Sequence, residues 1–334
     1  MGASKYKALV TGGGGFLAGH LIDKLLEGGH SVRTVELPGR DMGRLSALDL
    51  EIIEGDLCDP AVADRACEGV DVVFNPAALC ASVGPKKLFW SINVDLTDNL
   101  IAGCRKAGVK RLVQISSPSA VFDGTDHIDA DESLPYPKKW LNHYSETKAV
   151  SEQHVLAANG SDLETVAIRP HAIWGPRDRT LFPRIIERAR AKRIVRVGNG
   201  RNVISTLYVE NGADALVLAA TAEKAPGNVY FVTDADSIKL WDWLTRILND
   251  MGLPPINRKV PYPLVYAVGA TQEAIWSLFK LKGEPTVTRY SAAELAKNHS
   301  YSIERARSDL GYNPKIDREE GLKRFYEWAQ KEGI

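Results

Sequence analysis

The first half of the chain alternates short apolar runs with segments whose apolar residues recur at helical spacing. Residues 7–10 form the first such run. Phe16, Leu17, Leu21 and Leu25 then recur every three or four positions. Strands are predicted at residues 7–10, 31–35, 51–54, 70–74, 109–115 and 165–168, and helices after Pro60 and over 89–106 and 144–158. Strands that precede helices repeatedly are typical of right-handed βαβ units. The pattern predicts an α/β fold built on a doubly wound parallel sheet.

After residue 169 the strand-like and helix-like segments no longer alternate regularly. The sequence predicts a helix over 182–191, a short strand pair near 195–207, a helix over 211–222 and a strand over 229–232 that returns to the sheet. Helices over 240–251, 264–281 and 318–331 follow, separated by Pro- and Gly-containing breaks. We therefore expect a first domain of residues 1–169 plus roughly 203–233. Residues 170–202 and 234–334 are predicted to form a smaller, mainly helical, substrate-binding cap.

Composition narrows the class of protein. Lys plus Arg and Asp plus Glu both total 42, so no basic surplus favours nucleic acid as a partner. Four cysteines without a two-residue gap predict free thiols and no metal site. The N-terminal residues lack the features of a signal peptide, so we expect a cytoplasmic protein. Gln272 and Glu273 interrupt the apolar stretch 264–281, so we expect no membrane span but peripheral contact with a membrane surface.

A glycine-rich turn follows the first predicted strand. The residues from Thr11 to Gly19 read TGGGGFLAG, with the spacing G-x-x-G-x-x-A. Glycines at such a turn let the backbone approach a pyrophosphate, and the N-terminus of the next helix offers unpaired N–H groups. A glycine turn without a ligand is the alternative, and the strand–helix context disfavours it.

Glu36 closes the second predicted strand, 24 positions after Gly12. A carboxylate there can accept hydrogen bonds from both ribose hydroxyls of adenosine and repels a 2′-phosphate, which favours NAD. NADP stays open because Arg40 and Arg44 follow closely. Asp56, Leu57 and Ala77 follow the next two strands, along the same crevice.

Tyr144 and Lys148 are four positions apart on a predicted helix, so their side chains share one face. A nearby ammonium stabilises a phenolate, which makes the hydroxyl a usable acid or base. Ser116, Ser117 and Ser119 end the fifth strand at the same sheet edge as the glycine turn, where a hydroxyl could hold a substrate oxygen beside Tyr144. A surface tyrosine and ordinary turn serines are the alternatives.

These features, taken in this order, resemble the extended short-chain dehydrogenase/reductases, and more narrowly their 3β-hydroxysteroid dehydrogenase branch. That branch includes bacterial sterol dehydrogenases and reductases of 2-alkyl-3-oxoalkanoates. The resemblance covers nearly the whole chain and is carried by the segments SSPSAVFDG (116–124), DESLPYP (131–137), YSETKA (144–149), RPHAIWGP (169–176), YVEN (208–211) and LGYNP (310–314). It implies a Rossmann-like fold.

The resemblance also implies roles for single residues. Tyr144 would be the catalytic acid/base, Lys148 its pKa partner and a nicotinamide-ribose ligand, and Ser117 the group that orients the substrate oxygen, with Ser119 as the alternative. The implied cofactor residues are Gly12, Gly15, Phe16 and Leu17 for the pyrophosphate, Glu36 for the ribose, Asp56 and Leu57 for the adenine, Ala77 for close approach, and Pro170 for the nicotinamide. Two residues depart from the family pattern: Ala18 stands for a glycine and Asn75 for a histidine.

The predicted activity is hydride transfer between NAD and a hydrophobic secondary alcohol or ketone, such as a sterol, a 3β-hydroxysteroid or a long-chain β-keto acid. A nucleotide-sugar epimerase or dehydratase of the same superfamily is the alternative, and a regulator that has lost the chemistry is a third reading. The resemblance further implies a homodimer formed through the helices predicted at 89–106 and 144–158.

Overall fold

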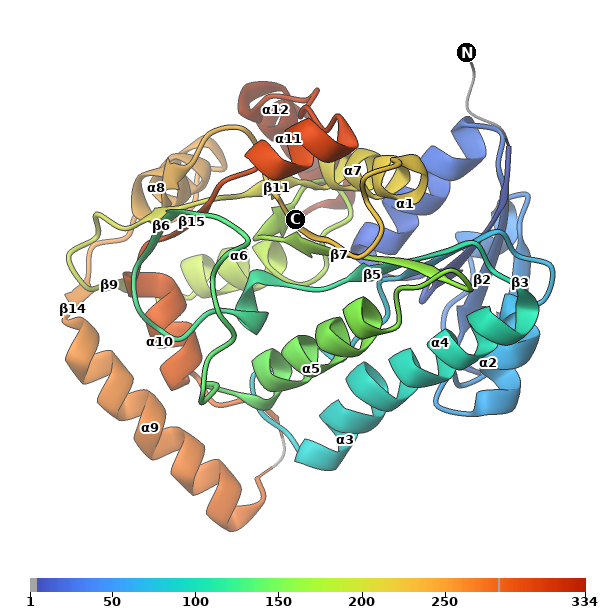
Figure 1. Ribbon diagram of the computed structural model, residues 1–334. Coiled ribbons are helices and arrows are strands. Elements are labelled where there is room, and N and C mark those ends of the chain that lie inside the picture. Colours follow the sequence, from blue (N-terminus) through green and yellow to red (C-terminus); the bar gives the residue numbers. More distant parts are fainter. Residues whose placement is uncertain (1–4, 282) are drawn as a thin grey trace.

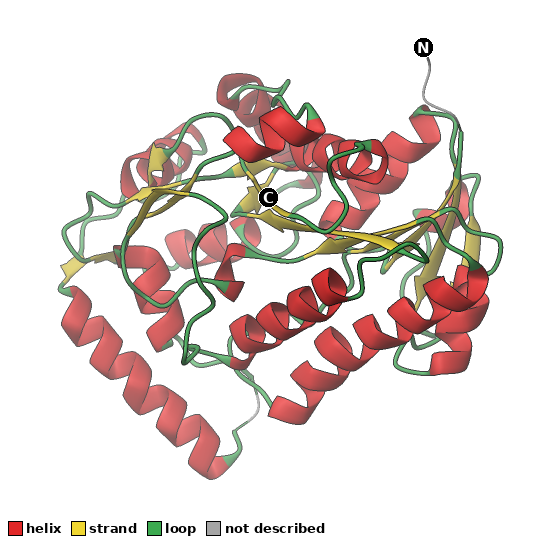
Figure 2. Ribbon diagram, in the orientation of Figure 1, coloured by secondary structure: helices red, strands yellow, loops and turns green. Residues whose placement is uncertain are grey.

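The computed structural model describes residues 5–281 and 283–334, so residues 1–4 and 282 of the predicted domains lie outside the described residues. Its centre is a seven-stranded sheet in the order β12-β7-β5-β4-β1-β2-β3, and every pairing in it is parallel (Figures 1 and 2). The strands are β1 (Lys7–Thr11), β2 (Ser31–Glu36), β3 (Glu51–Glu54), β4 (Val72–Asn75), β5 (Arg111–Ile115), β7 (Glu164–Pro170) and β12 (Val229–Val232). The predicted doubly wound sheet is confirmed, and β12 joins it beside β7.

Helices cover both faces of this sheet (Figure 1). On one face lie α1 (Phe16–Glu27), α7 (Val209–Thr221) and α11 (Glu304–Leu310), packed over a core cluster that includes Leu21 and Tyr230. On the other lie α2 (Pro60–Cys67), α4 (Leu96–Ala107) and α5 (His143–Ala157). Because both faces are covered, strands such as β5 are buried along their whole length.

The helix predicted over 89–106 has an irregular middle. It comprises α3 (Lys86–Trp90), the π-helical segment η2 (Ser91–Asp95) and α4, which follow one another without a break. Two 3₁₀ turns, η1 (Leu45–Ala47) and η3 (Pro118–Ala120), lie in loops at the ends of strands. A π segment inside an α-helix often marks a functional position.

Outside the main sheet the chain contains more strand than the sequence analysis predicts. A four-stranded sheet runs in the order β13-β10-β15-β6, and two strand pairs, β11 with β8 and β14 with β9, lie apart from it. The strands are β6 (His127–Ala130), β8 (Ile173–Trp174), β9 (Arg196–Val197), β10 (Val203–Ile204), β11 (Leu207–Tyr208), β13 (Ile238–Lys239), β14 (Lys259–Val260) and β15 (His299–Tyr301). The strand pair predicted near 195–207 is wrong, since β9, β10 and β11 each pair with a distant strand instead of with one another.

Five helices complete the cap: α6 (Phe182–Arg190), α8 (Leu240–Asp250), α9 (Tyr262–Phe279), α10 (Arg289–Ala296) and α12 (Arg318–Glu332). Most of them pack around an aromatic core that includes Trp174, Phe182 and Phe325. α9 lies at the edge of the molecule against α10 (Figure 1). Among the described residues, no helix combines the length and the apolar character needed to cross a membrane.

Candidate active site

The predicted site residues lie where the strands of the main sheet end. β1 has β2 on one side and β4 on the other, so the order of the strands reverses there and a crevice opens above their carboxyl ends. Thr11, the last residue of β1, is hydrogen-bonded to the end of β4 and to the loop that follows it. Its Oγ1 donates to Asn75 Oδ1 at 2.8 Å and accepts from the backbone N–H of Ala77 at 3.1 Å. Asn75 also donates to Gln114 Oε1 at 2.9 Å, so this departure from the family pattern ties β1, β4 and β5 together.

The glycine turn leaves no room for side chains. Gly12 has a φ of 61°, which favours glycine. A Cβ on Gly13 would lie 2.4 Å from Thr34 Oγ1, and one on Gly15 would lie 3.0 Å from the carbonyl oxygen of Gly12. α1 begins at Phe16, so the N–H groups of its first turn, Leu17 included, face this bare backbone without partners inside the helix. The turn fits the pyrophosphate of a dinucleotide.

Glu36 lies beside this turn, at the end of β2. Its Oε1 accepts the backbone N–H of Gly14 at 2.6 Å, which fixes the carboxylate at the mouth of the crevice. The Arg44 guanidinium turns toward α1 instead, where it pairs with Asp23 and donates to the carbonyl of Gly19. The end of β2 therefore presents a fixed carboxylate beside the glycine turn, and Arg44 faces away from it.

The two predicted adenine residues follow β3. Asp56 Oδ1 accepts the backbone N–H of Cys58 at 2.9 Å, and Leu57 is buried with its carbonyl bound by Asn99. Pro170 ends β7 at the same edge of the sheet. The predicted cofactor residues thus lie at or after the carboxyl ends of strands of the main sheet, while their roles stay predictions.

Lys148 is anchored beneath this crevice. α5 begins after Asn142, whose side chain caps it by accepting the backbone N–H of Ser145 at 2.8 Å. One turn later Lys148 is buried, and its Nζ donates to the carbonyl of Ile115, the last residue of β5, at 2.6 Å. Burial lowers the pKa of Lys148 to about 8.

Tyr144 lies near Ser117 and Cys80. Burial raises the pKa of Tyr144 well above its usual value and the Cys80 thiol raises it further, while a hydrogen bond with Ser117 opposes the rise. Ser117 Oγ also accepts the backbone N–H of Ser119 at 3.2 Å. Ser119 Oγ is buried and, within the described chain, has no hydrogen-bond partner. This arrangement favours Ser117 over Ser119 as the hydroxyl that meets the substrate oxygen.

One residue near the helix of Tyr144 escapes the sequence analysis. Asn93, buried in η2, accepts the backbone N–H of Leu79 at 2.7 Å and donates to Thr147 Oγ1 at 2.9 Å. It therefore fixes the loop that carries Cys80 against the helix of Tyr144 and Lys148. A lone asparagine in a helical pattern offers no signal in the sequence, and the π segment around it is visible only in three dimensions.

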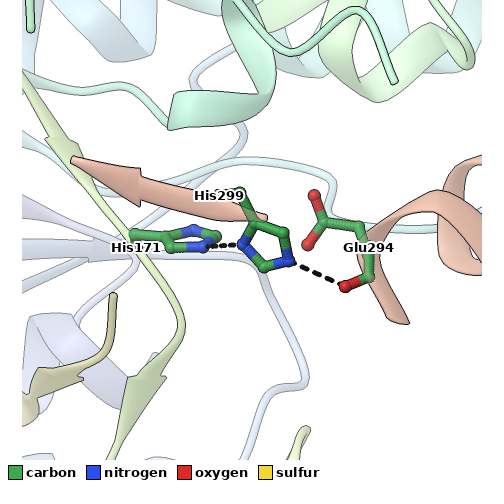
Figure 3. A group of neighbouring side chains, drawn as sticks. All are labelled: His171, Glu294 and His299. Atoms are coloured by element: carbon green, nitrogen blue, oxygen red, sulfur yellow. Dashed lines mark hydrogen bonds between the residues drawn. The ribbon is translucent and has the colours of Figure 1, made fainter. Parts of the chain in front are cut away.

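The cap contributes His171, Glu294 and His299, whose potential ligand atoms lie within 4.8 Å of one another (Figure 3). His299 Nε2 donates to the Glu294 backbone carbonyl at 2.7 Å, so its Nδ1 accepts from His171 Nε2 at 2.6 Å. Nitrogens on one tetrahedral zinc ion lie about 3.3 Å apart. The two rings are therefore arranged as a hydrogen-bonded chain, and the expectation of no metal stays a prediction.

A separate hollow of about 340 Å³ lies in the cap. It is lined by polar residues that include Asn199, Arg201 and Lys297, and by Tyr262. None of the predicted site residues lines it, so the crevice above the strand ends remains the candidate active site.

Known proteins resemble the chain over nearly its full length. The model of the 3-beta hydroxysteroid dehydrogenase/isomerase family matches residues 9–263. A 2-alkyl-3-oxoalkanoate reductase from Stenotrophomonas maltophilia is 40% identical over 326 residues, which cover 96% of this chain and 98% of that protein. A decarboxylating sterol-4-alpha-carboxylate 3-dehydrogenase from Mus musculus is 35% identical over 332 residues, covering 95% and 89%.

Solved structures share the fold. The crystal structure of gox2253 matches with a TM-score of 0.81 and 27% identity, covering 98% of this chain and 99% of that one. MoeE5, solved with UDP-glucose and NAD, matches with a TM-score of 0.74 and 23% identity over 98% and 100% of the two chains, and this likeness shows the fold alone. From the family match and the relatives, the chain belongs to the 3-beta hydroxysteroid dehydrogenase/isomerase family of NAD(P)-dependent oxidoreductases.

Proposed function

We propose that the protein is an NAD-dependent oxidoreductase that interconverts a secondary alcohol and a ketone on a hydrophobic substrate. The observation that carries the proposal is the position of Tyr144, Lys148 and Ser117 at the sheet edge that holds the glycine turn. NAD, when bound, supplies or accepts the hydride. Gly12 to Leu17 would hold its pyrophosphate and Glu36 its adenosine ribose, because the bare turn and the fixed carboxylate fit those groups.

Three residues of the chain orient the substrate, transfer the proton and adjust the pKa of the phenol. Ser117 donates a hydrogen bond to the substrate oxygen and so orients the carbonyl or hydroxyl group. Tyr144 gives its proton to that oxygen in reduction and takes it back in oxidation. Lys148 lies one turn further along α5 than Tyr144, and in this proposal its ammonium opposes the rise that burial causes in the pKa of the phenol.

The cap supports a hydrophobic substrate. Phe122 packs edge to face with Tyr290 and His299, and Tyr301 with His171, and we propose that the substrate lies on this aromatic side of the sheet edge. The names of the relatives include β-keto acids and sterols, and we propose a substrate in that range. Assays with UDP-glucose test the alternative of a nucleotide-sugar epimerase.

Replacement of Tyr144 tests this function. In Tyr144→Phe, turnover of a lipid alcohol found by screening with NADH absorbance should fall about a hundredfold or more, because no group then moves the proton. The dissociation constant of NAD should stay near the wild-type value. Tyr326→Phe, which removes a hydroxyl bound to Asp250 far from the crevice, is the matched control. Near-normal turnover in Tyr144→Phe would remove Tyr144 from the mechanism.

A further inference from the structure

Glu294 places a carboxylate beside His171, at the end of β7. Its side chain lies within 4.8 Å of ring nitrogens of His171 and His299 (Figure 3). His171 directly follows Pro170 at the end of β7, and β7 is the neighbour of β5, whose end leads into Ser117. The Glu294 charge also contributes to the raised pKa values of Tyr144 and Tyr290. Glu294 therefore lies beside the residue that follows β7, and close enough to Tyr144 for its charge to act on the catalytic hydroxyl.

This carboxylate is not neutralised by the protein. Within the described residues it forms no ion pair and accepts no hydrogen bond, since only its backbone carbonyl binds His299. Neither neighbouring histidine compensates it. Burial and His299 lower the pKa of His171 well below its usual value and keep that ring neutral. Both ring nitrogens of His299 are used in hydrogen bonds with His171 and with the Glu294 backbone carbonyl.

The cationic side chains of Arg169 and Lys148 already have hydrogen-bond partners within the protein. The Arg169 guanidinium is buried and pairs with Glu152 at 2.6 Å, and the Lys148 ammonium donates to Ile115. A second anion close to the half-buried Glu294 would be repelled by a carboxylate with which no described side chain pairs.

We propose that Glu294 is a specificity-determining residue that selects neutral alcohols and ketones and rejects substrates with a carboxylate beside the reacting carbon. This inference rests on the proposed oxidoreductase function and narrows its substrate class. It favours an uncharged sterol-like or ester-like substrate, whereas two relatives are named for oxoalkanoates and sterol carboxylates.

The test compares an acid with its own ester. The specificity constant kcat/KM is measured by NADH absorbance at pH 7.5 for 3-hydroxydecanoate and for methyl 3-hydroxydecanoate. The wild-type protein should prefer the ester by about tenfold or more. Glu294→Gln, which keeps the size of the side chain and removes its charge, should reduce that preference to near unity. Glu187→Gln removes an exposed carboxylate of α6 and should keep the wild-type ratio.

Binding without turnover separates this inference from the proposed reaction. Dissociation constants of decanoate and methyl decanoate are measured by tryptophan fluorescence in the presence of NAD. If neither hydroxy compound is oxidised but the ester still binds about tenfold more tightly, and only in proteins that retain Glu294, the charge selection holds and the proposed reaction fails. A wild-type protein that treats acid and ester alike, or a Glu294→Gln protein that keeps the preference, overturns the inference.

Discussion

For Lys148, the sequence predicts the helix face but not the hydrogen-bond partner of the side chain. The four-residue spacing from Tyr144 predicts a shared helix face, and α5 contains both residues. The partner of the ammonium was not predictable, because the carbonyl of Ile115 lies 33 positions away and reaches Lys148 only when β5 ends beside α5. The same holds for Glu294, whose site neighbour His171 comes from the distant β7 end.

The buried ammonium of Lys148 makes stability depend on pH. Its folded-state pKa of about 8 lies below the usual 10.5, so between these values the unfolded chain holds a proton that the folded chain has lost. The free energy of unfolding of the wild type should therefore rise with pH through this window, by roughly 2–3 kcal/mol relative to Lys148→Met. Urea unfolding at pH 7.5 and pH 10 measures the difference.

Exposed Lys139→Met is the control for this measurement, and it should follow the wild type at both pH values. A Lys148→Met protein whose stability changes with pH as the wild type does would show that Lys148 titrates in its ordinary range.

Glu36 should decide which dinucleotide binds. We expect the wild type to prefer NAD over NADP, because the carboxylate fixed by Gly14 repels a 2′-phosphate. In Glu36→Gln that preference should fall by about tenfold, the effect of removing one close charge. The ratio of the two dissociation constants measures it, with Glu54→Gln at the end of β3 as the control. A wild-type preference for NADP would mean that exposed Arg40 or Arg44 dominates.

At the scale of elements, the long regular pieces were predictable and the short ones were not. The strands of the main sheet and helices such as α8 and α12 have strong periodicity, and they appear within a few residues of their predicted bounds. Two-residue strands such as β9 and β14 carry no periodicity of their own, and they exist because tertiary packing brings them together. The helix α10, which carries Glu294, was missed because Pro and Gly breaks precede it and its apolar pattern is weak.

α9 is the element that we propose meets a membrane surface. Only Val265 and Gly269 on it are buried, whereas Leu278 and Phe279 are 76% and 65% exposed. Replacement of both by serine should reduce co-sedimentation with phosphatidylglycerol-containing vesicles severalfold, because exposed apolar area drives interfacial binding. The NAD dissociation constant should not change. Ile128→Ser, which alters an equally exposed residue on β6, is the control. Unchanged vesicle binding in the double variant would refute the contact.

At the scale of the whole molecule, we propose a homodimer. α4 and α5 lie side by side on one face of the sheet (Figure 1), and small residues, Ala102 and Ala157, are exposed on them. Small side chains let helices of two copies approach closely in a symmetric contact. Light scattering should give twice the mass of the chain, and the double substitution of both alanines by arginine should give a monomer. Ala191→Arg, beyond α6, should remain a dimer; a monomeric wild type would refute the proposal.

The π-helical segment η2 determines what the loss of a single residue from this helix would do to the molecule. A π turn accommodates one residue more than an α turn. Deletion of one residue from Ser91–Asp95 would let α3 and α4 join as one regular helix with both flanks in register, and it would remove the π turn that positions Asn93. Asn93 would then leave Leu79 and Thr147. A one-residue gap here would preserve the fold and erase the support of the catalytic helix, so during divergence of related chains such a gap would accompany a change or loss of activity.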